Sequence, residues 1–166
     1  MKEILFRGKR KENGKWVYGG IMTDDDYVAI CRCNDFYGWY EHIEVIPETV
    51  GQFTGLYDAT PWEELTTDEQ AWFLYPENGD KRSKDDWKGK PIFEGDICRF
   101  REWNNGDMCW IGKVYFEHQQ FVISGNKNKE CETPFTLAMS RFISKNIEII
   151  GNIHDNPELL KEGAKI

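Results

Sequence analysis

The side chains best suited to chemistry are five cysteines and three histidines, and their spacing decides whether they could hold a metal. Cys31 and Cys33 flank Arg32, and residues two apart in an extended strand face the same side. A closed zinc site needs about four ligands, commonly in two close pairs. The other candidate ligands have no regular spacing with this pair: Cys98, Cys109, Cys131, His42, His118 and His154. The sequence therefore predicts free thiols, with no bound metal and no cofactor.

Catalysis by a nucleophile or by paired carboxylates is the second chemistry to consider. A nucleophilic Ser or Cys needs a base within reach, and the chain has no Gly-x-Ser-x-Gly elbow, phosphate loop or dinucleotide fingerprint. Glu94 and Asp96 could perform acid–base work. Their Glu-Gly-Asp setting instead favours a tight turn in which the carboxylates cap the backbone and face solvent. We therefore predict that the protein is not an enzyme and has no catalytic residues.

Cationic and aromatic side chains form a third pattern, which could bind a ligand. Small barrels use such surfaces to stack bases, although a solvated hairpin tip and packed rings would explain the same residues. The net charge of −8, from 21 basic and 29 acidic residues, opposes non-specific binding to phosphates. The candidate binding surface comprises Arg7, Lys9, Arg10, Lys11, Arg32, Trp39, Tyr40, Trp62 and Trp72.

Short strands are the elements that must position these residues. A length of 166 residues suits one domain spanning 1–166. Runs rich in β-branched and aromatic residues alternate with turn signals. The first pair of runs is joined by Asn13-Gly14, the dipeptide preferred in type I′ hairpins, and the stretch 89–100 around Glu94-Gly95-Asp96 predicts another hairpin or a barrel corner. We predict a mainly β, barrel-like fold.

Helix signals are confined to a few places. Thr60-Pro61 and Thr67 resemble helix starts, so we predict one helix or two short ones within 60–75, in a helical insert spanning 59–84. Its apolar face would comprise Trp62, Leu65, Trp72 and Phe73. Residues 134–142 predict a helical turn, and Asn156 is expected to cap a short C-terminal helix.

Five blocks follow one another from near one end of the chain to the other: Phe6–Lys9, Gly14–Gly19, Thr49–Leu56, Ile92–Ile97 and Ile149–Leu160. In this order they resemble the YopX family of small phage and prophage proteins. The resemblance implies a β-rich fold, a phage or prophage origin and self-association. It implies no activity, because the function of the family is unknown. The family's short form lacks a counterpart of residues 59–84, which separate the third block from the fourth.

These observations predict a phage accessory protein that binds a phage or host protein partner as a homo-oligomer. No apolar run approaches the length of a membrane span, and the first residues lack a signal-peptide pattern, so we expect the host cytoplasm and no membrane. A different class of function remains open: a nucleic-acid-binding module that uses the basic N-terminal hairpin and the aromatic residues near Trp39. Salt-dependent retention on DNA or RNA would separate the two.

Overall fold

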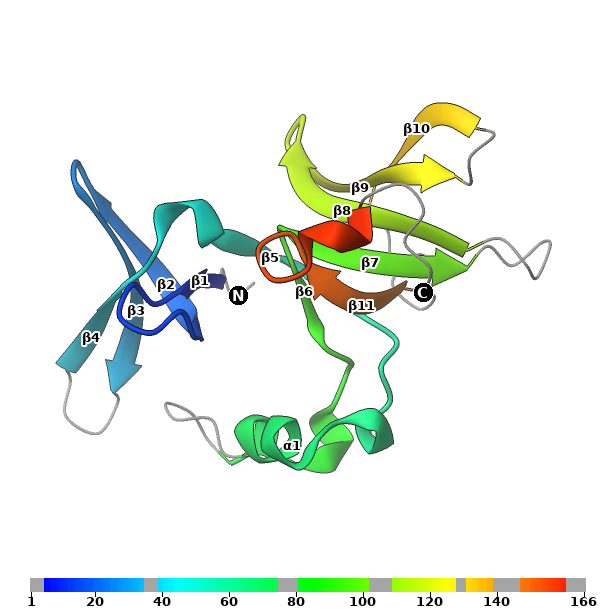
Figure 1. Cartoon of the computed structure of the whole chain (residues 1–166). Helices are drawn as coiled ribbons and strands as arrows, with labels where there is room; N and C mark the ends of the chain where they lie inside the picture. Colours follow the sequence, from blue (N-terminus) through cyan, green and yellow to red (C-terminus); the bar gives the residue numbers. More distant parts are fainter. Residues whose placement is uncertain are drawn as a thin grey trace. The chain divides into compact units, whose positions relative to one another are not determined.

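The computed structural model describes residues 5–34, 39–74, 81–101, 109–127, 131–138 and 147–160. Antiparallel strands dominate these residues (Figure 1), so the predicted mainly β class is confirmed. The chain divides into two compact units, the first from Met1–Phe53 and Thr60–Gly89, the second from Thr54–Ala59 and Lys90–Ile166. Strand β5 (Gly51–Tyr57) contributes its first half to one unit and its second half to the other.

The first unit contains the strand order β4-β3-β2-β1-β5. Its strands are β1 (Phe6–Lys9), β2 (Trp16–Asp24), β3 (Tyr27–Asn34) and β4 (Trp39–Glu44), followed by the 3-10 turn η1 (Pro47–Thr49). Alternation along the strands directs one set of side chains to a common core. Val17, Ile30, Ile43 and Val45 are buried there, and Phe6, Val28 and Val50 pack against them.

The β1–β2 hairpin forms as predicted, but its turn differs from type I′. Lys9 pairs with Trp16, and Arg10 N donates to Lys15 O at 2.9 Å, which leaves four residues, 11–14, in the loop. Gly14 has φ 69°, whereas Asn13 has a negative φ, and a type I′ turn needs positive φ at both central residues. The Asn13 side chain instead accepts a hydrogen bond from Lys15 N at 3.0 Å.

The second unit contains the strand order β10-β9-β8-β7-β11, and the end of β5 neighbours β6. Its elements are β6 (Pro91–Phe93), β7 (Asp96–Arg101), β8 (Cys109–Glu117), β9 (Gln120–Lys127), β10 (Cys131–Ala138), β11 (Ile147–Asn152) and the 3-10 turn η5 (Pro157–Leu160). Ile92, Cys98, Val114, Ile123 and Ile147 are all fully buried in its core, with Leu56 and Ile149 packed against them.

Three expectations about these strands need correction. Among the described residues no closed barrel is found, because the outer strands of the second unit, β10 and β11, each have one strand neighbour. The helical turn predicted at 134–142 is wrong over Pro134–Ala138, which belong to β10. A shift of register between Cys131 and Phe135 accommodates Pro134 in this outer strand. Up to residue 160, where the described part of the chain ends, the predicted C-terminal helix is a single 3-10 turn, and Asn156 Oδ1 accepts from Asn152 N at 3.4 Å.

Residues 60–89 contain the described helical structure between β5 and β6. The elements are the 3-10 turn η2 (Trp62–Glu64), helix α1 (Thr67–Leu74) and the 3-10 turn η3 (Lys84–Asp86). The expected cap at Thr67 lies one residue earlier: Thr66 Oγ1 accepts from Glu69 N at 3.3 Å, while Glu69 Oε2 accepts from Thr66 N at 2.8 Å. The expected start at Thr60 is a 3-10 turn instead, without a side-chain cap. That residues 59–84 are an appended insert stays a prediction.

Candidate functional site

Three aromatic rings in residues 60–89 pack against one another and form what we call the aromatic cluster: Trp62, Phe73 and Trp87. Ring centroids lie 5.7 Å apart for Trp62 and Phe73, 5.9 Å for the two tryptophans and 5.0 Å for Phe73 and Trp87, all edge to face. Phe73 is buried, whereas both tryptophans are half-buried. Edge-to-face packing is favourable beyond the apolar area that it buries, so the cluster is a small core for these residues.

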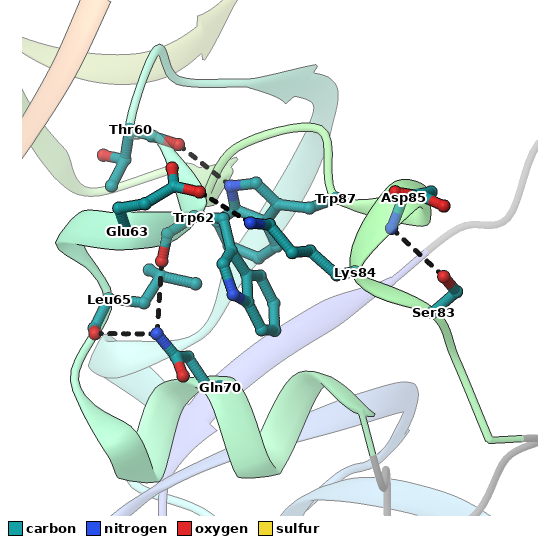
Figure 2. Close-up of polar contacts among 9 residues, drawn as sticks. All are labelled: Thr60, Trp62, Glu63, Leu65, Gln70, Ser83, Lys84, Asp85 and Trp87. Atoms are coloured by element: carbon teal, nitrogen blue, oxygen red, sulfur yellow. Dashed lines mark hydrogen bonds and ion pairs between the residues drawn. The ribbon is translucent and has the colours of Figure 1, made fainter.

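Polar contacts hold the segments around the aromatic cluster (Figure 2). Trp87 Nε1 donates to Thr60 O at 2.9 Å, which joins the two ends of the segment. Gln70 Nε2, from α1, donates to the carbonyls of Trp62 and Leu65, each at 3.3 Å. These contacts tie both 3-10 turns and the helix to one another through backbone carbonyls, which would otherwise need water or another donor.

The outer side of this segment is charged. Lys84 Nζ lies 2.7 Å from Glu63 Oε1, and both side chains are more than half exposed. The hydrogen bond from Lys84 lowers the pKa of Glu63 below its ordinary value. An exposed ion pair adds little stability, so the aromatic rings, and not this pair, hold the segment together.

The sequence placed Trp62, Leu65, Trp72 and Phe73 on one apolar face of the predicted helical segment. Leu65 and Phe73 are buried and Trp62 packs in the aromatic cluster, while the side chain of Trp72 lies outside the described residues. Trp87 supplies part of the cover from within the same segment. It was missed because it follows a polar stretch that indicates a loop.

The basic residues of β1 are brought together on one aromatic ring. Arg7 and Lys9 are two apart on β1 and therefore share a face. The Arg7 guanidinium lies 4.6 Å from the Trp16 ring centroid and the Lys9 ammonium lies 5.3 Å from it. Only 7% of Arg7 is exposed. Arg7 thus contributes to packing of the first unit, and Lys9 is the more accessible of the two.

The other candidates described in the first unit have contacts of their own. The Lys11 ammonium pairs with the Glu44 carboxylate, and Arg10 forms an isolated bridge with Val45. Arg32 Nε donates to Tyr18 O at 3.1 Å. Trp39 and Tyr40 lie on β4 opposite Asn34 and Cys33, but their side chains lie outside the described residues.

Three carboxylates of the second unit bind backbone amides. Asp58, which the sequence did not single out, is 4% exposed. Its Oδ1 accepts from Lys90 N at 2.7 Å and its Oδ2 from Ile149 N at 3.2 Å. Asp96 Oδ2 accepts from Phe93 N at 2.7 Å and Glu94 Oε1 from Phe116 N at 3.2 Å. The predicted capping is therefore present, but the predicted exposure of Asp96 is wrong, since it is 1% exposed.

An exposed apolar surface lies at the end of the β8–β9 hairpin. Phe116 and Phe121 are opposite each other, with ring centroids 5.0 Å apart. Phe116 is 50% exposed. We call this pair the docking edge, because contiguous exposed apolar side chains are typical of interaction sites.

The described ranges contain neither a metal-type side-chain cluster nor a helix of membrane-spanning length. There, no three His, Cys, Asp or Glu residues group as a metal ion would require. Cys31 is half-buried and Cys98 buried, both as free thiols. Helix α1 is far too short to cross a membrane, and no longer helix occurs in the described part of the chain.

A comparison with protein families matches the end of the first unit and most of the second. A family described as YopX protein matches residues 83–161. These residues belong to the YopX family. The YopX match contains two of the five blocks that carry the resemblance, Ile92–Ile97 and Ile149–Leu160. It ends at residue 161, one residue after Leu160. The three N-terminal blocks lie before it. A comparison with curated proteins found no match.

Proposed function

We propose that this chain is a phage or prophage accessory protein that acts by binding and assembly and catalyses no reaction. The YopX match supports the phage-type assignment. The binding role rests on one observation, the docking edge, where Phe116 leaves half of its surface in water. Exposing a large ring forfeits part of the roughly 1.5–3 kcal/mol that its burial would contribute, so a partner that covers it gains that contribution.

We propose that the protein catalyses no reaction because three of its carboxylates are bonded to backbone N–H groups. Asp58, Asp96 and Glu94 each accept a backbone N–H. A carboxylate held by backbone donors is a structural acceptor, whereas a general base needs access to a substrate proton.

Affinity purification with a matched pair of variants tests the binding role. The bait is the whole chain, produced in cells that carry the phage or prophage. Phe116→Ser removes the exposed ring, and Ile21→Ser removes another exposed apolar side chain, 37% exposed, from the first unit. We expect one protein to co-purify in fixed ratio with the wild type and with Ile21→Ser, but not with Phe116→Ser. Equal recovery with all three baits would contradict the proposal.

The proposal includes self-association in the host cytoplasm. Outer strands such as β4 and β10 present backbone groups that a second copy could pair with. Light scattering should then give a mass above the 19.5 kDa of one chain. A single 19.5 kDa species at micromolar concentration would refute self-association and leave the binding role untouched.

Nucleic-acid binding is the second candidate, and it is supported by the placement of Arg7 and Lys9 over Trp16. Burial of Arg7 and the net charge of −8 weigh against it. Retention on single-stranded DNA or RNA that falls steeply with salt, and falls further in Lys9→Ala, would favour this candidate.

A further inference from the structure

The loop between β1 and β2 contains two adjacent residues that can react with each other, Asn13 and Gly14. Both are exposed to water. Because glycine has no side chain, nothing on Gly14 hinders attack of its backbone nitrogen on Cγ of Asn13. The new N–Cγ bond closes a succinimide ring, and the side-chain nitrogen takes up the proton of the attacking amide and leaves as ammonia. Water then opens the ring to aspartate or isoaspartate. Sequence and exposure alone therefore favour deamidation at Asn13.

The folded loop restrains the nucleophile of this reaction. Gly14 N donates to Arg10 O at 2.9 Å, and the attack requires Gly14 N to give up the proton of this bond. Arg10 N in turn donates to Lys15 O at 2.9 Å. The backbone on both sides of Asn13 is thus paired across the loop, and freeing Gly14 N leaves the Arg10 carbonyl without this donor.

The same loop restrains the group that would be attacked. Asn13 Oδ1 accepts from Lys15 N at 3.0 Å, a bond from an asparagine side chain to the backbone two residues later, which is common in turns. This bond limits rotation of the carboxamide. Ring closure needs Cγ to reach a near-attack position at Gly14 N, so both reacting groups are held by hydrogen bonds of their own.

Further contacts tie the loop to the end of β4. Lys11 N donates to Glu44 O at 3.1 Å, and the Lys11 ammonium pairs with the Glu44 carboxylate. Arg10 also forms a bridge with Val45. A movement of the loop that frees Asn13 and Gly14 together therefore has to overcome more than the two bonds of these residues.

We propose that Asn13 is a site of spontaneous deamidation that the folded β1–β2 loop keeps inactive, and that the reaction starts when the loop opens. Reaction through an open state is slowed by the rarity of that state. Two hydrogen bonds that must break first should slow the conversion of Asn13 about tenfold or more relative to the unfolded chain.

The two products differ in what they do to the loop. Aspartate at position 13 still offers an oxygen to Lys15 N. Isoaspartate adds one CH₂ group to the backbone between residues 13 and 14, so Gly14 N and Arg10 O no longer meet in the same register. A loop that has opened and formed isoaspartate cannot close again in its original form.

The experiment follows conversion of Asn13 in the full chain by peptide mapping and mass spectrometry. The chain is incubated in mildly alkaline buffer, with and without denaturing urea. Two other Asn-Gly pairs, Asn78-Gly79 and Asn105-Gly106, lie outside the described residues and serve in urea as references for unconstrained reaction. In urea Asn13 should convert about as fast as these two, and in buffer it should convert about tenfold or more slowly than in urea.

A matched pair of variants tests the bond to Asn13 Oδ1. Lys15→Pro removes the N–H that donates to Asn13 Oδ1, whereas Lys15→Ala removes the same side chain and keeps the N–H. In buffer, Asn13 should convert about fivefold faster in Lys15→Pro than in Lys15→Ala, as expected for loss of one hydrogen bond. Each rate is divided by the rate of the same variant in urea, which corrects for any effect of the sequence itself.

Circular dichroism shows whether each variant keeps its β structure. If Lys15→Pro unfolds, the comparison of the wild type in buffer and in urea still decides. Equal rates of Asn13 conversion for the wild type in buffer and in urea would overturn the proposal. Equal corrected rates for folded Lys15→Pro and Lys15→Ala would overturn it as well.

Discussion

Replacing Asp58 with alanine should destabilise the second unit more than any single surface change. The Asp58 carboxylate joins three stretches of chain: its own end of β5, the residue before β6 and β11. It accepts from Lys90 N at 2.7 Å, 32 residues away, and from Ile149 N at 3.2 Å, 91 residues away. Each hydrogen bond to a charged group is worth about 1.5–3 kcal/mol, so two give about 3–6 kcal/mol. The longer Ile149 bond favours the lower end, about 3 kcal/mol.

The assay is urea denaturation followed by circular dichroism. A domain is stable by only about 5–15 kcal/mol, so a loss of about 3 kcal/mol is a large part of its free energy of unfolding. Asp26→Ala is the matched control: Asp26 is exposed in the β2–β3 turn, and such a change should stay within about 0.5 kcal/mol of wild type. Asp58→Asn keeps one acceptor oxygen and should fall between the two. A loss below about 1 kcal/mol in Asp58→Ala would refute the reasoning that this carboxylate joins the sheet.

Two further predictions concern residues 60–89. Trp87→Ala removes a half-buried ring and the bond to Thr60 O, so it should cost about 2–3 kcal/mol, below the range for a fully buried tryptophan. Amide exchange in α1 should accelerate in Trp87→Ala. Lys84→Met breaks only an exposed ion pair and should leave amide exchange in α1 nearly unchanged. Unchanged protection of α1 in Trp87→Ala would contradict the role of the aromatic cluster. Replacing residues 60–88 with Asn-Gly should preserve β-sheet circular dichroism and cooperative unfolding, because Asp58 N and Lys90 O already lie 2.9 Å apart. Loss of cooperative unfolding would assign the segment to the β core.

Local patterns were sufficient to predict most strands and the first hairpin. Alternation between polar and apolar residues is a property of neighbouring positions, and turn residues such as Gly14 act within a few residues. The same reasoning failed at Pro134, because Pro is compatible with an outer strand at a shift of register as well as with a turn. Closure into a barrel depends on which strands meet, and periodicity within each strand carries no such information.

Side chains that act over long sequence separations could not be identified from the sequence. Asp58 reads as one more polar residue at the end of a strand, yet its partners are 32 and 91 residues away. Trp87 stands after a charged stretch, and only the fold brings it 5.0 Å from Phe73. The exposed position of Phe116 was equally hidden, since its spacing from Val114 predicts the same face but not where the core ends.

The two blocks of the resemblance within the YopX match, Ile92–Ile97 and Ile149–Leu160, make structural contacts in the second unit. Gly95 has φ 84°, a conformation that favours glycine. Its N–H donates to Val114 O at 2.9 Å and its carbonyl accepts from Ile153 N at 2.9 Å, so one turn ties β8 to the chain after β11. Asn152 Oδ1 accepts from His154 N and Asp155 N at 2.9 and 3.0 Å and shapes the following turn. Phe116 lies outside these blocks, so the proposed binding role does not depend on the residues that carry the resemblance.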